Sequence, residues 1–156
     1  MLLSDGMDEV SWQILRELQE NARITFSELG RRVGLSPPAV AERVRGLEEA
    51  GIIAGYRAEV NLEKIGLPLL AYVRIATDER TCGQFSATVK GIPEILECHR
   101  VTGGDSYIVK AAVSTVQHLE DLLNRLNHYG QTVTALALSS PVRHRVVEPV
   151  KFPKNG

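Results

Sequence analysis

Few residues in this sequence could act as nucleophiles, general bases or metal ligands, and they lie far apart. The candidates are His99, His118, His128, His144, Cys82, Cys98 and Asp105. Cys98 and His99 are adjacent, so a strand would point them to opposite faces. His118 and His128 are ten residues apart, so a helix would place them on different sides. No pair has the spacing of a nucleophile with its base or of a metal site. The sequence therefore predicts no enzyme, no metal site and no cofactor.

Arginine is concentrated in the first third of the chain and could bind nucleic acid. Between residues 23 and 57 every basic residue is an arginine, namely Arg23, Arg31, Arg32, Arg43, Arg45 and Arg57. A guanidinium group can bind a phosphate or fork onto a guanine base. The formal net charge is only -1, so binding would depend on a local basic face. Four interleaved glutamates leave a solvated surface of mixed charge as the alternative.

A glycine-containing segment between two apolar runs could bind a small molecule. Its residues are Gly103, Gly104, Asp105, Ser106 and Tyr107. Glycines leave backbone N–H groups accessible, and the carboxylate of Asp105 could accept a bond from an amino group. The segment could thus be an amino-acid site, or simply a hairpin turn.

Amphipathic helices are predicted to position the arginines. Asp8 can cap a first helix, which carries apolar residues on one face: Val10, Ile14, Leu15 and Leu18. Thr25 and Glu28 have the spacing of a capping box. A second helix should therefore begin there and end near Val33.

A tight turn should join the second helix to a third. Ser36 can cap the third helix, and Pro37 occupies its first position, where a missing N–H costs nothing. The helix should end at Gly51 and bury Val40, Val44 and Leu47. This is the helix-turn-helix pattern, in which the second helix of the pair enters the major groove N-terminus first. The residues placed to contact DNA are Ser36, Pro38, Ala39, Glu42, Arg43 and Arg45.

The segment Ile52–Val60 is predicted to follow as an extended ribbon, the wing. Tyr56 and Arg57 could reach the DNA backbone from it, although Tyr56 could equally be a packing residue. The alternative for the whole region is a plain three-helix bundle, in which Arg43 forms a salt bridge with a glutamate.

Beyond residue 68 the hydrophobic pattern changes to a period of two, which predicts strands. Strands are expected at residues 70–75, 95–101, 107–113 and 132–139. Phe85, Val89 and Ile92 indicate one helix, and a capping box at Ser114–Gln117 begins another. The order βαββαβ is the ferredoxin-like arrangement, in which helices cover one face of an antiparallel sheet. The other face is apolar enough to predict pairing with a second subunit.

The stretch from Met7 to Leu67 resembles the DNA-binding half of the Lrp/AsnC family, the leucine-responsive or feast/famine regulators of bacteria and archaea. The likeness is strongest in LQENARITFSELGRRVGLSPPAVAERVRGLEEAGIIAGY and continues to the C-terminus. Family sequences usually open with Leu-Asp and a second Asp three residues later. This chain has Met7-Asp8 and then Ser11 and Trp12, so it lacks that second carboxylate.

The resemblance implies an effector site and an assembly. In the family the turn that corresponds to residues 103–107, together with a threonine of the last strand, here Thr134, lies where effector amino acids bind between dimers. Asp105 stands one place earlier than in the leucine-responsive members, so leucine is not implied as the ligand. The resemblance also implies homodimers that assemble into tetramers or octamers.

The predicted architecture is α+β, with a winged helix-turn-helix at residues 1–60, a hinge at 61–67 and a ferredoxin-like domain for effector binding and oligomerisation at 68–156. No apolar run of roughly 20 residues or signal peptide is evident, and the two cysteines form no CxxC pair. We therefore expect a cytoplasmic regulator that binds double-stranded DNA and whose affinity or oligomeric state responds to a small molecule, with an amino acid as the expected class. The alternative is an architectural DNA-binding protein that uses no effector.

Overall fold

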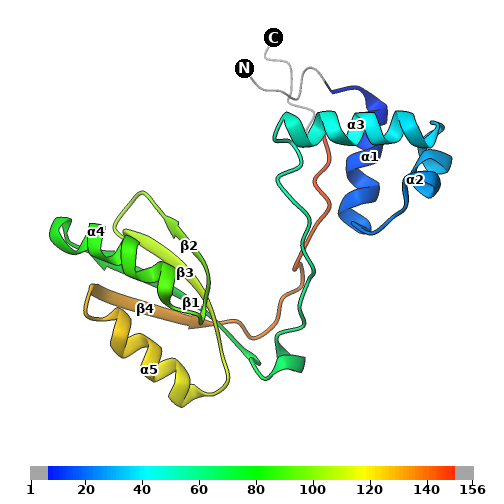
Figure 1. Cartoon of the computed structure of the whole chain (residues 1–156). Helices are drawn as coiled ribbons and strands as arrows, with labels where there is room; N and C mark the ends of the chain where they lie inside the picture. Colours follow the sequence, from blue (N-terminus) through cyan, green and yellow to red (C-terminus); the bar gives the residue numbers. More distant parts are fainter. Residues whose placement is uncertain (1–6, 150–156) are drawn as a thin grey trace, which may run out of the picture. The chain divides into compact units, whose positions relative to one another are not determined.

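A computed structural model describes residues 7–149 of the chain. The chain forms two compact units (Figure 1). One holds the residues up to Glu59 together with the segment that begins at Val142, and the other spans Val60–Pro141. The chain therefore passes between the units twice. Within residues 7–149 no helix is both long and apolar enough to cross a membrane.

The first unit is built from three helices, α1 (Glu9–Glu20), α2 (Phe26–Val33) and α3 (Pro37–Glu49). Asp8 caps α1 as predicted, because its side chain accepts a hydrogen bond from the Ser11 N–H. The apolar faces of the helices meet in one core of Ile14, Leu18, Leu29, Val40, Val44 and Leu47. The predicted apolar pattern of the third helix is confirmed, since its three predicted core residues are all buried.

Two glycines allow the tight turn between α2 and α3. Gly34 ends α2 in the left-handed conformation, with φ of 73°. Gly30 lies inside α2, where a Cβ atom would come within 2.4 Å of the Leu35 carbonyl oxygen. The turn therefore packs directly on the backbone of Gly30, a requirement that the helical pattern did not reveal.

Several local predictions for this unit are wrong in detail. Thr25 does accept a hydrogen bond from the Glu28 N–H, but the Glu28 carboxylate binds Arg31 and Arg32 and so does not complete a capping box. Ser36 stands at the N-cap of α3 without a side-chain capping bond. The segment Ile52–Val60 contains no strand, so the predicted wing is absent as a paired ribbon. A ribbon needs a second strand, and none of the described residues provides one here.

The second unit is a four-stranded antiparallel sheet with two α-helices. The strands are β1 (Leu69–Thr77), β2 (Ile95–Arg100), β3 (Tyr107–Val113) and β4 (Gly130–Leu136), in the order β2-β3-β1-β4. The helices are α4 (Glu79–Thr88) and α5 (Val116–Leu126), and single 3-10 turns lie at Glu63–Ile65 and Val89–Gly91. The predicted βαββαβ order is confirmed. α5 begins one residue later than predicted, because Thr115 rather than Ser114 caps it.

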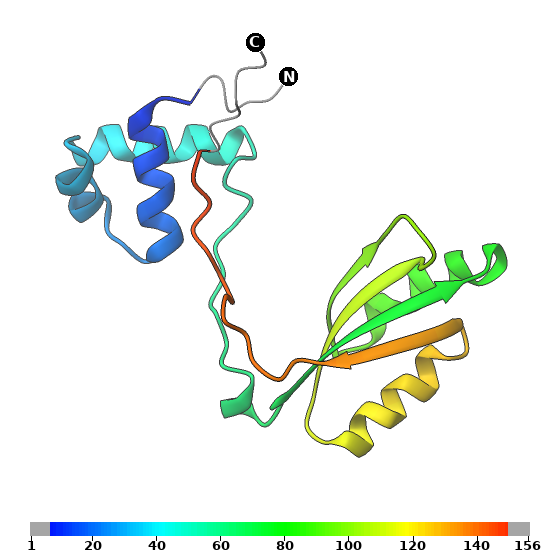
Figure 2. The same cartoon turned by 180° about the vertical axis from the view of Figure 1, so that it is seen from behind.

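Both α-helices of this unit lie on one side of the sheet (Figure 1). Alternate residues of β1 and β3 pack against Phe85 of α4 and Leu122 of α5 in a single core. Figure 2 shows the same cartoon from behind. The strand registers place Tyr72, Ile108 and Val133 on the opposite face of the sheet. Tyr72 and Val133 are 41% and 48% exposed. This uncovered face agrees with the expectation from the sequence.

The segment after Val142 departs from the predicted domain boundary. It packs with the helical unit rather than with the sheet, although the prediction assigned residues 68–156 to one domain. Its Val147 backbone is hydrogen-bonded by Gln19 of α1, and Glu148 pairs with Arg16. The segment has no periodic pattern, so periodicity could not predict this return. Residues 1–6 and 150–156, also assigned to the two predicted domains, lie outside the described residues.

Candidate DNA-reading helix and ligand cleft

The first turns of α3 form an exposed surface of small and polar side chains. Ser36, Pro38, Glu42 and Arg45 are exposed and Ala39 is half-buried, while the opposite side of the helix is packed in the core. Four of the predicted DNA-contacting residues are thus accessible along one side of the helix that a helix-turn-helix inserts into the major groove. Small side chains at residues 38 and 39 leave room for close approach to bases.

Arg43 is held by an ion pair that the sequence did not reveal. Its Nη1 lies 2.6 Å from Asp8 Oδ2, 2.7 Å from Asp8 Oδ1 and 3.1 Å from Ser11 Oγ. Hydrogen bonds to the Asp8 carboxylate, first from Arg43 and then from Ser11, lower the pKa of Asp8 to about 2. The pair joins the start of α1 to the middle of α3. Arg43 therefore has a structural role, and replacing it would not leave folding untouched, as a pure DNA contact would.

Two further arginines are anchored on α2. Arg31 and Arg32 both bind Glu28, at 2.7 and 2.8 Å, and Arg32 also lies 2.6 Å from Glu17 of α1. Arg31 and then Arg32 lower the pKa of Glu28 to about 2. Glu28, one of the four interleaved glutamates, therefore neutralises part of the arginine cluster together with Glu17 of α1. Arg45 of α3 stays exposed.

Tyr56 is attached to the end of α3. Its hydroxyl donates to Glu48 Oε1 at 2.7 Å, and burial followed by this bond raises its pKa to about 12. The ring is nevertheless 47% exposed. Tyr56 is thus bonded to α3 and still partly exposed, so the predicted packing role and the predicted contact role both remain available to it.

The glycine-containing turn joins β2 to β3, as the sequence predicted. Gly103 has φ of 111°, a conformation that side chains rarely adopt. Asp105 Oδ2 lies 3.6 Å from Arg74 Nη1. Gly103 and Gly104 are exposed, and Asp105 is half-buried. The predicted backbone and carboxylate groups are therefore accessible at this turn.

Ser106 and Tyr107 hold the turn in place rather than present their side chains at its tip. Ser106 Oγ accepts from the Thr77 N–H at 3.0 Å, and the Ser106 N–H donates to the Ile75 carbonyl at 2.8 Å. Tyr107 is 5% exposed, and its hydroxyl donates to the Cys82 carbonyl at 3.2 Å. These bonds connect the turn to the end of β1 and the start of α4.

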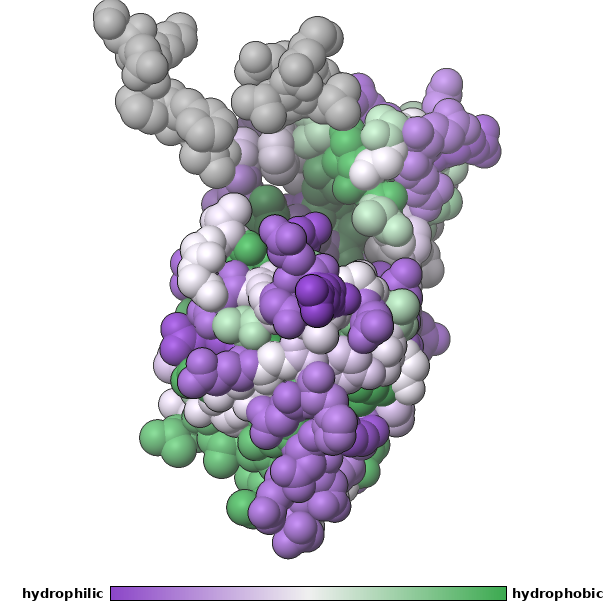
Figure 3. Space-filling view, turned by 90° about the vertical axis from the view of Figure 1, so that its left-hand side faces the viewer, coloured by the Kyte–Doolittle hydropathy of each residue, from purple (hydrophilic) through white to green (hydrophobic). Residues whose placement is uncertain are grey.

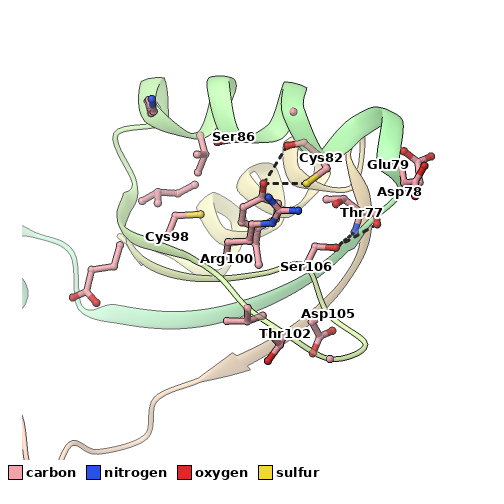
Figure 4. Close-up of a pocket in the computed structure, with 18 of the residues that line it drawn as sticks. Thr77, Asp78, Glu79, Cys82, Ser86, Cys98, Arg100, Thr102, Asp105 and Ser106 are labelled. Atoms are coloured by element: carbon pink, nitrogen blue, oxygen red, sulfur yellow. Dashed lines mark hydrogen bonds between the residues drawn. The ribbon is translucent and has the colours of Figure 1, made fainter. Parts of the chain in front are cut away.

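A cleft of about 1200 Å³ opens beside the turn, between α4 and the β2–β3 hairpin. Figure 4 shows Thr102 and Asp105 at the turn and Arg100, Cys82 and Ser106 along the cleft. The cleft is lined by the Arg100 guanidinium and, at the turn, by Asp105, whose carboxylate also contacts Arg74 on the other face of the sheet. Arg100 was not among the residues predicted from the sequence, although its place opposite buried Tyr107 in the hairpin puts both side chains on the same face of the sheet.

Thr134 does not join the turn within one chain. It lies opposite Val73 in the β1–β4 ladder, and Val73 is fully buried beneath the helices. Thr134 therefore lies on the helix-covered face. Arg74, which contacts Asp105, lies on the other face. The structure thus separates the predicted effector residues into a turn group and Thr134.

The surface around this end of the sheet domain is mostly polar. Figure 3 looks from the left-hand side of Figure 1, and hydrophilic side chains dominate the near surface of the domain, with hydrophobic ones gathered toward its lower left edge. Among residues 7–149 no group of three His, Cys, Asp or Glu side chains could hold a metal ion. Because charged side chains such as Lys90, Glu97 and Arg100 line the cleft, a polar ligand suits it better than an apolar one.

Family models match both units of the chain. Residues 7–48 match the AsnC-type helix-turn-helix domain, and residues 70–147 match the Lrp/AsnC ligand binding domain. The first match covers α1, α2 and all but the last residue of α3, and the second runs from the second residue of β1 past the end of β4 and includes the turn and the cleft.

Individual relatives agree with these matches over nearly their full length. The HTH-type transcriptional regulator YezC of Bacillus subtilis is 39% identical over 138 residues, which are 88% of this chain and 98% of that protein. The solved structure of B. subtilis LrpC is 36% identical, with a TM-score of 0.83, covering 86% of this chain and 96% of LrpC. A feast or famine regulatory protein from M. tuberculosis, solved in complex with L-methionine, is 35% identical, with a TM-score of 0.85, covering 91% of this chain and 99% of that chain.

Proposed function

This chain belongs to the Lrp/AsnC family of DNA-binding transcriptional regulators, and on that basis we propose that it regulates transcription at specific DNA sites in response to an amino acid. The observation that carries the proposal is the combination of an exposed α3 with a cleft that contains Asp105 and Arg100. The family consists of regulators and not of enzymes. Because its partner is chromosomal double-stranded DNA, we place the protein in the cytoplasm.

In this proposal α3 reads the major groove with its N-terminal half. Pro38 and Ala39 let the helix approach closely, and Glu42 can accept a hydrogen bond from a cytosine amino group. Arg45 and Arg57, both exposed, supply phosphate contacts that set affinity and its salt dependence. Arg43 contributes mainly by holding α3 against Asp8.

Arg45→Ala tests the DNA half. If Arg45 contacts one phosphate, the variant binds every duplex more weakly, and the slope of log affinity against log salt falls by about one. Arg80→Ala, which removes an exposed arginine from α4 in the other unit, is the matched control and should leave both quantities unchanged. An Arg45→Ala variant with the wild-type salt slope would remove Arg45 from the interface.

The ligand half rests on complementary charges in the cleft. The amino group of a bound amino acid would meet Asp105, and its carboxylate would meet Arg100 and the exposed N–H groups of the turn. The methionine complex of the M. tuberculosis relative supports an amino acid as the ligand class. The side chain of the ligand would extend toward α4, where Cys82 and Val89 line the cleft.

A thermal-shift screen of the full chain with the twenty common amino acids tests this half. A ligand that binds only the folded state raises the melting temperature. We expect at least one amino acid to do so, and Asp105→Asn and Arg100→Gln to abolish that shift. Asp121→Asn, on the exposed side of α5, should retain it. If none of the twenty amino acids raises the melting temperature, an architectural DNA-binding protein is favoured.

The uncovered sheet face supports a dimer. Two copies paired through this face would present two α3 helices to a roughly palindromic site, with half-sites on the order of 34 Å apart. We further propose that dimers assemble into tetramers or octamers, in which Thr134 lies next to the glycine-containing turn, residues 103–107, of another copy. Its separation from the turn within one chain favours that arrangement.

A further inference from the structure

The last described segment of the chain, Val142–Pro149, forms a strap on the outer face of α1. Gln19 binds both backbone groups of Val147: the Val147 N–H donates to Gln19 Oε1 at 2.8 Å, and Gln19 Nε2 donates to the Val147 carbonyl at 3.1 Å. The Gln19 amide thus makes the two backbone hydrogen bonds that a neighbouring strand would make. The contact requires an extended backbone and does not depend on the valine side chain.

An ion pair fixes the register of the strap. Arg16 Nη2 lies 2.7 Å from Glu148 Oε1. Arg16 and Gln19 are three residues apart on α1, which is about 4.5 Å along a helix, and this is close to the roughly 3.3 Å between successive residues of an extended chain. Val147 and Glu148 can therefore bind Gln19 and Arg16 at once, so the strap runs antiparallel to α1.

The strap also reaches the residues proposed to contact DNA. Val147 lines an apolar groove of about 540 Å³ together with Trp12 and Leu15 of α1, Ile52, and Tyr56 and Arg57. His144 Nε2 lies 3.5 Å from Glu59 Oε1, so the two chain segments that leave this unit touch each other. Release of Val147 would open one wall of the groove against which Tyr56 packs.

At its N-terminal end the strap follows directly from the four-stranded sheet of the second unit. β4 ends at Leu136, and the Ala137 N–H still donates to the Leu70 carbonyl at 2.8 Å. Only residues 138–141 separate this last sheet bond from the strap. A change in the position of β4 therefore acts on the strap through a few residues of chain.

From these contacts we propose that the strap is a second link between the two units, which passes the ligand state of the sheet domain to the DNA-reading unit by docking on or leaving α1. The proposal rests on the proposed function of a ligand-responsive regulator. The contacts suit a reversible device because they are exposed: the Arg16 and Glu148 side chains are 52% and 59% exposed, and exposed ion pairs bind weakly. The strap would then have two states of similar free energy, which a ligand can shift.

Charge reversal of the full chain tests the link. Arg16→Glu and Glu148→Arg should each release the strap, and the double variant should restore the pair with opposite polarity. Gln19→Ala releases the strap without a charge change, and Glu20→Ala, the exposed neighbour on α1, is its control. Hydrogen exchange at Val147 reports docking directly, and we expect it to accelerate at least tenfold in Gln19→Ala and in each single reversal.

The second measurement is the ratio of DNA dissociation constants with and without a mixture of the twenty amino acids. The released variants should show a ratio near one, although the mixture still raises their melting temperatures, and the double reversal should recover the wild-type ratio. A wild-type ratio retained by variants whose strap is released overturns the link and leaves the proposed function standing. If the wild-type protein binds no DNA, or if its DNA affinity does not change with the mixture, the proposed function is contradicted. The proposed link, which rests on that function, is then contradicted as well.

Discussion

At the scale of single residues, Asp8 serves two parts of the helical unit. It caps α1 and holds Arg43 of α3. The hydrogen bonds from Arg43 and Ser11 lower its pKa to about 2. A carboxyl whose pKa is lowered by folding stabilises the protein above its unfolded pKa, which is about 3.9. That stabilisation is lost as the pH falls from about 4 to about 2.

Asp8→Asn isolates the charge, because asparagine is also a good N-cap. We expect this variant to have a lower melting temperature at pH 7 and to lose less stability than wild type between pH 4 and pH 2. Melting curves followed by circular dichroism across that range measure both effects. Glu120→Gln on the exposed side of α5 is the control. Parallel curves for Asp8→Asn and wild type would show that the pair does not stabilise the fold.

The two cysteines lie in the same cleft but in different surroundings. A hydrogen bond between Cys82 Sγ and the Tyr107 hydroxyl, which are 3.2 Å apart, lowers the pKa of Cys82, and Thr77 and Arg100 act in the same direction against burial. Burial raises the pKa of Cys98. Because the thiolate is the nucleophile, Cys82 should react faster with iodoacetamide at pH 7.

Peptide mass spectrometry of partly alkylated protein measures this difference. We expect Cys82 to be modified several times faster than Cys98, and Tyr107→Phe to slow Cys82 selectively. Equal rates for the two cysteines in wild type would contradict the assigned environment.

Residue types were predictable at this scale, but their pairings were not. The sequence identified Arg43, Asp105 and the turn glycines as candidates. It could not show that Asp8, 35 residues from Arg43 along the chain, neutralises that arginine. Such a pair depends on how α1 crosses α3, and a pattern within one helix contains no information about a crossing.

At the scale of elements, the helix-turn-helix depends on a glycine that lies inside a helix. A Cβ atom at Gly30 would clash with the backbone oxygen of Leu35 at 2.4 Å, so the turn would have to move. Gly46 in α3 has no atom within 4 Å of its Cβ position. The two glycines therefore respond to the same substitution in opposite ways.

Gly30→Ala should destabilise the protein by about 1–3 kcal/mol, as overpacking does, and should weaken DNA binding because the turn positions α3. Gly46→Ala should stabilise it by about 0.5–1 kcal/mol, since alanine is the better helix former. Chemical denaturation followed by circular dichroism measures both free energies of unfolding. A neutral Gly30→Ala would mean that the turn can relax without cost.

Elements with a strong period were predictable, and irregular ones were not. The three N-terminal helices and the βαββαβ order were predicted from the spacing of apolar residues, and the structure contains all of these elements. The prediction of a wing was wrong because the residue pattern of Ile52–Val60 indicates an extended chain but does not show whether a partner strand pairs with it. The capping positions shifted because hydroxyl residues are adjacent at Ser114 and Thr115, and either could cap a helix.

At the scale of the whole molecule, the uncovered sheet face should set the oligomeric state. Tyr72→Glu and Val133→Glu would each place a charge on that face and are expected to convert the proposed dimer to a monomer. Val116→Glu introduces the same charge at α5 on the helix side, where Val116 is 67% exposed, and should leave the dimer intact. Sedimentation analysis distinguishes these outcomes. Dimers that persist in both sheet variants would place the subunit contact elsewhere.

The two-unit organisation was predictable from the change in hydrophobic period near residue 68, but the return of the chain to α1 was not. That return joins residues 128 positions apart, Gln19 and Val147, through an irregular segment. The site in the cleft was half predictable, because the turn carries glycines and a carboxylate in sequence, whereas Arg100 and Cys82 reach it only through the packing of α4 on the sheet.

The most direct test of the central claim is fluorescence anisotropy of the full chain with the duplex upstream of its own coding sequence. A scrambled duplex is the competitor, at two salt concentrations and with and without the amino-acid mixture. The account predicts tighter binding to the upstream duplex, weaker binding at higher salt, and a dissociation constant that changes with the mixture. Equal affinity for both duplexes, or no binding to either at low salt, would contradict a sequence-specific regulator.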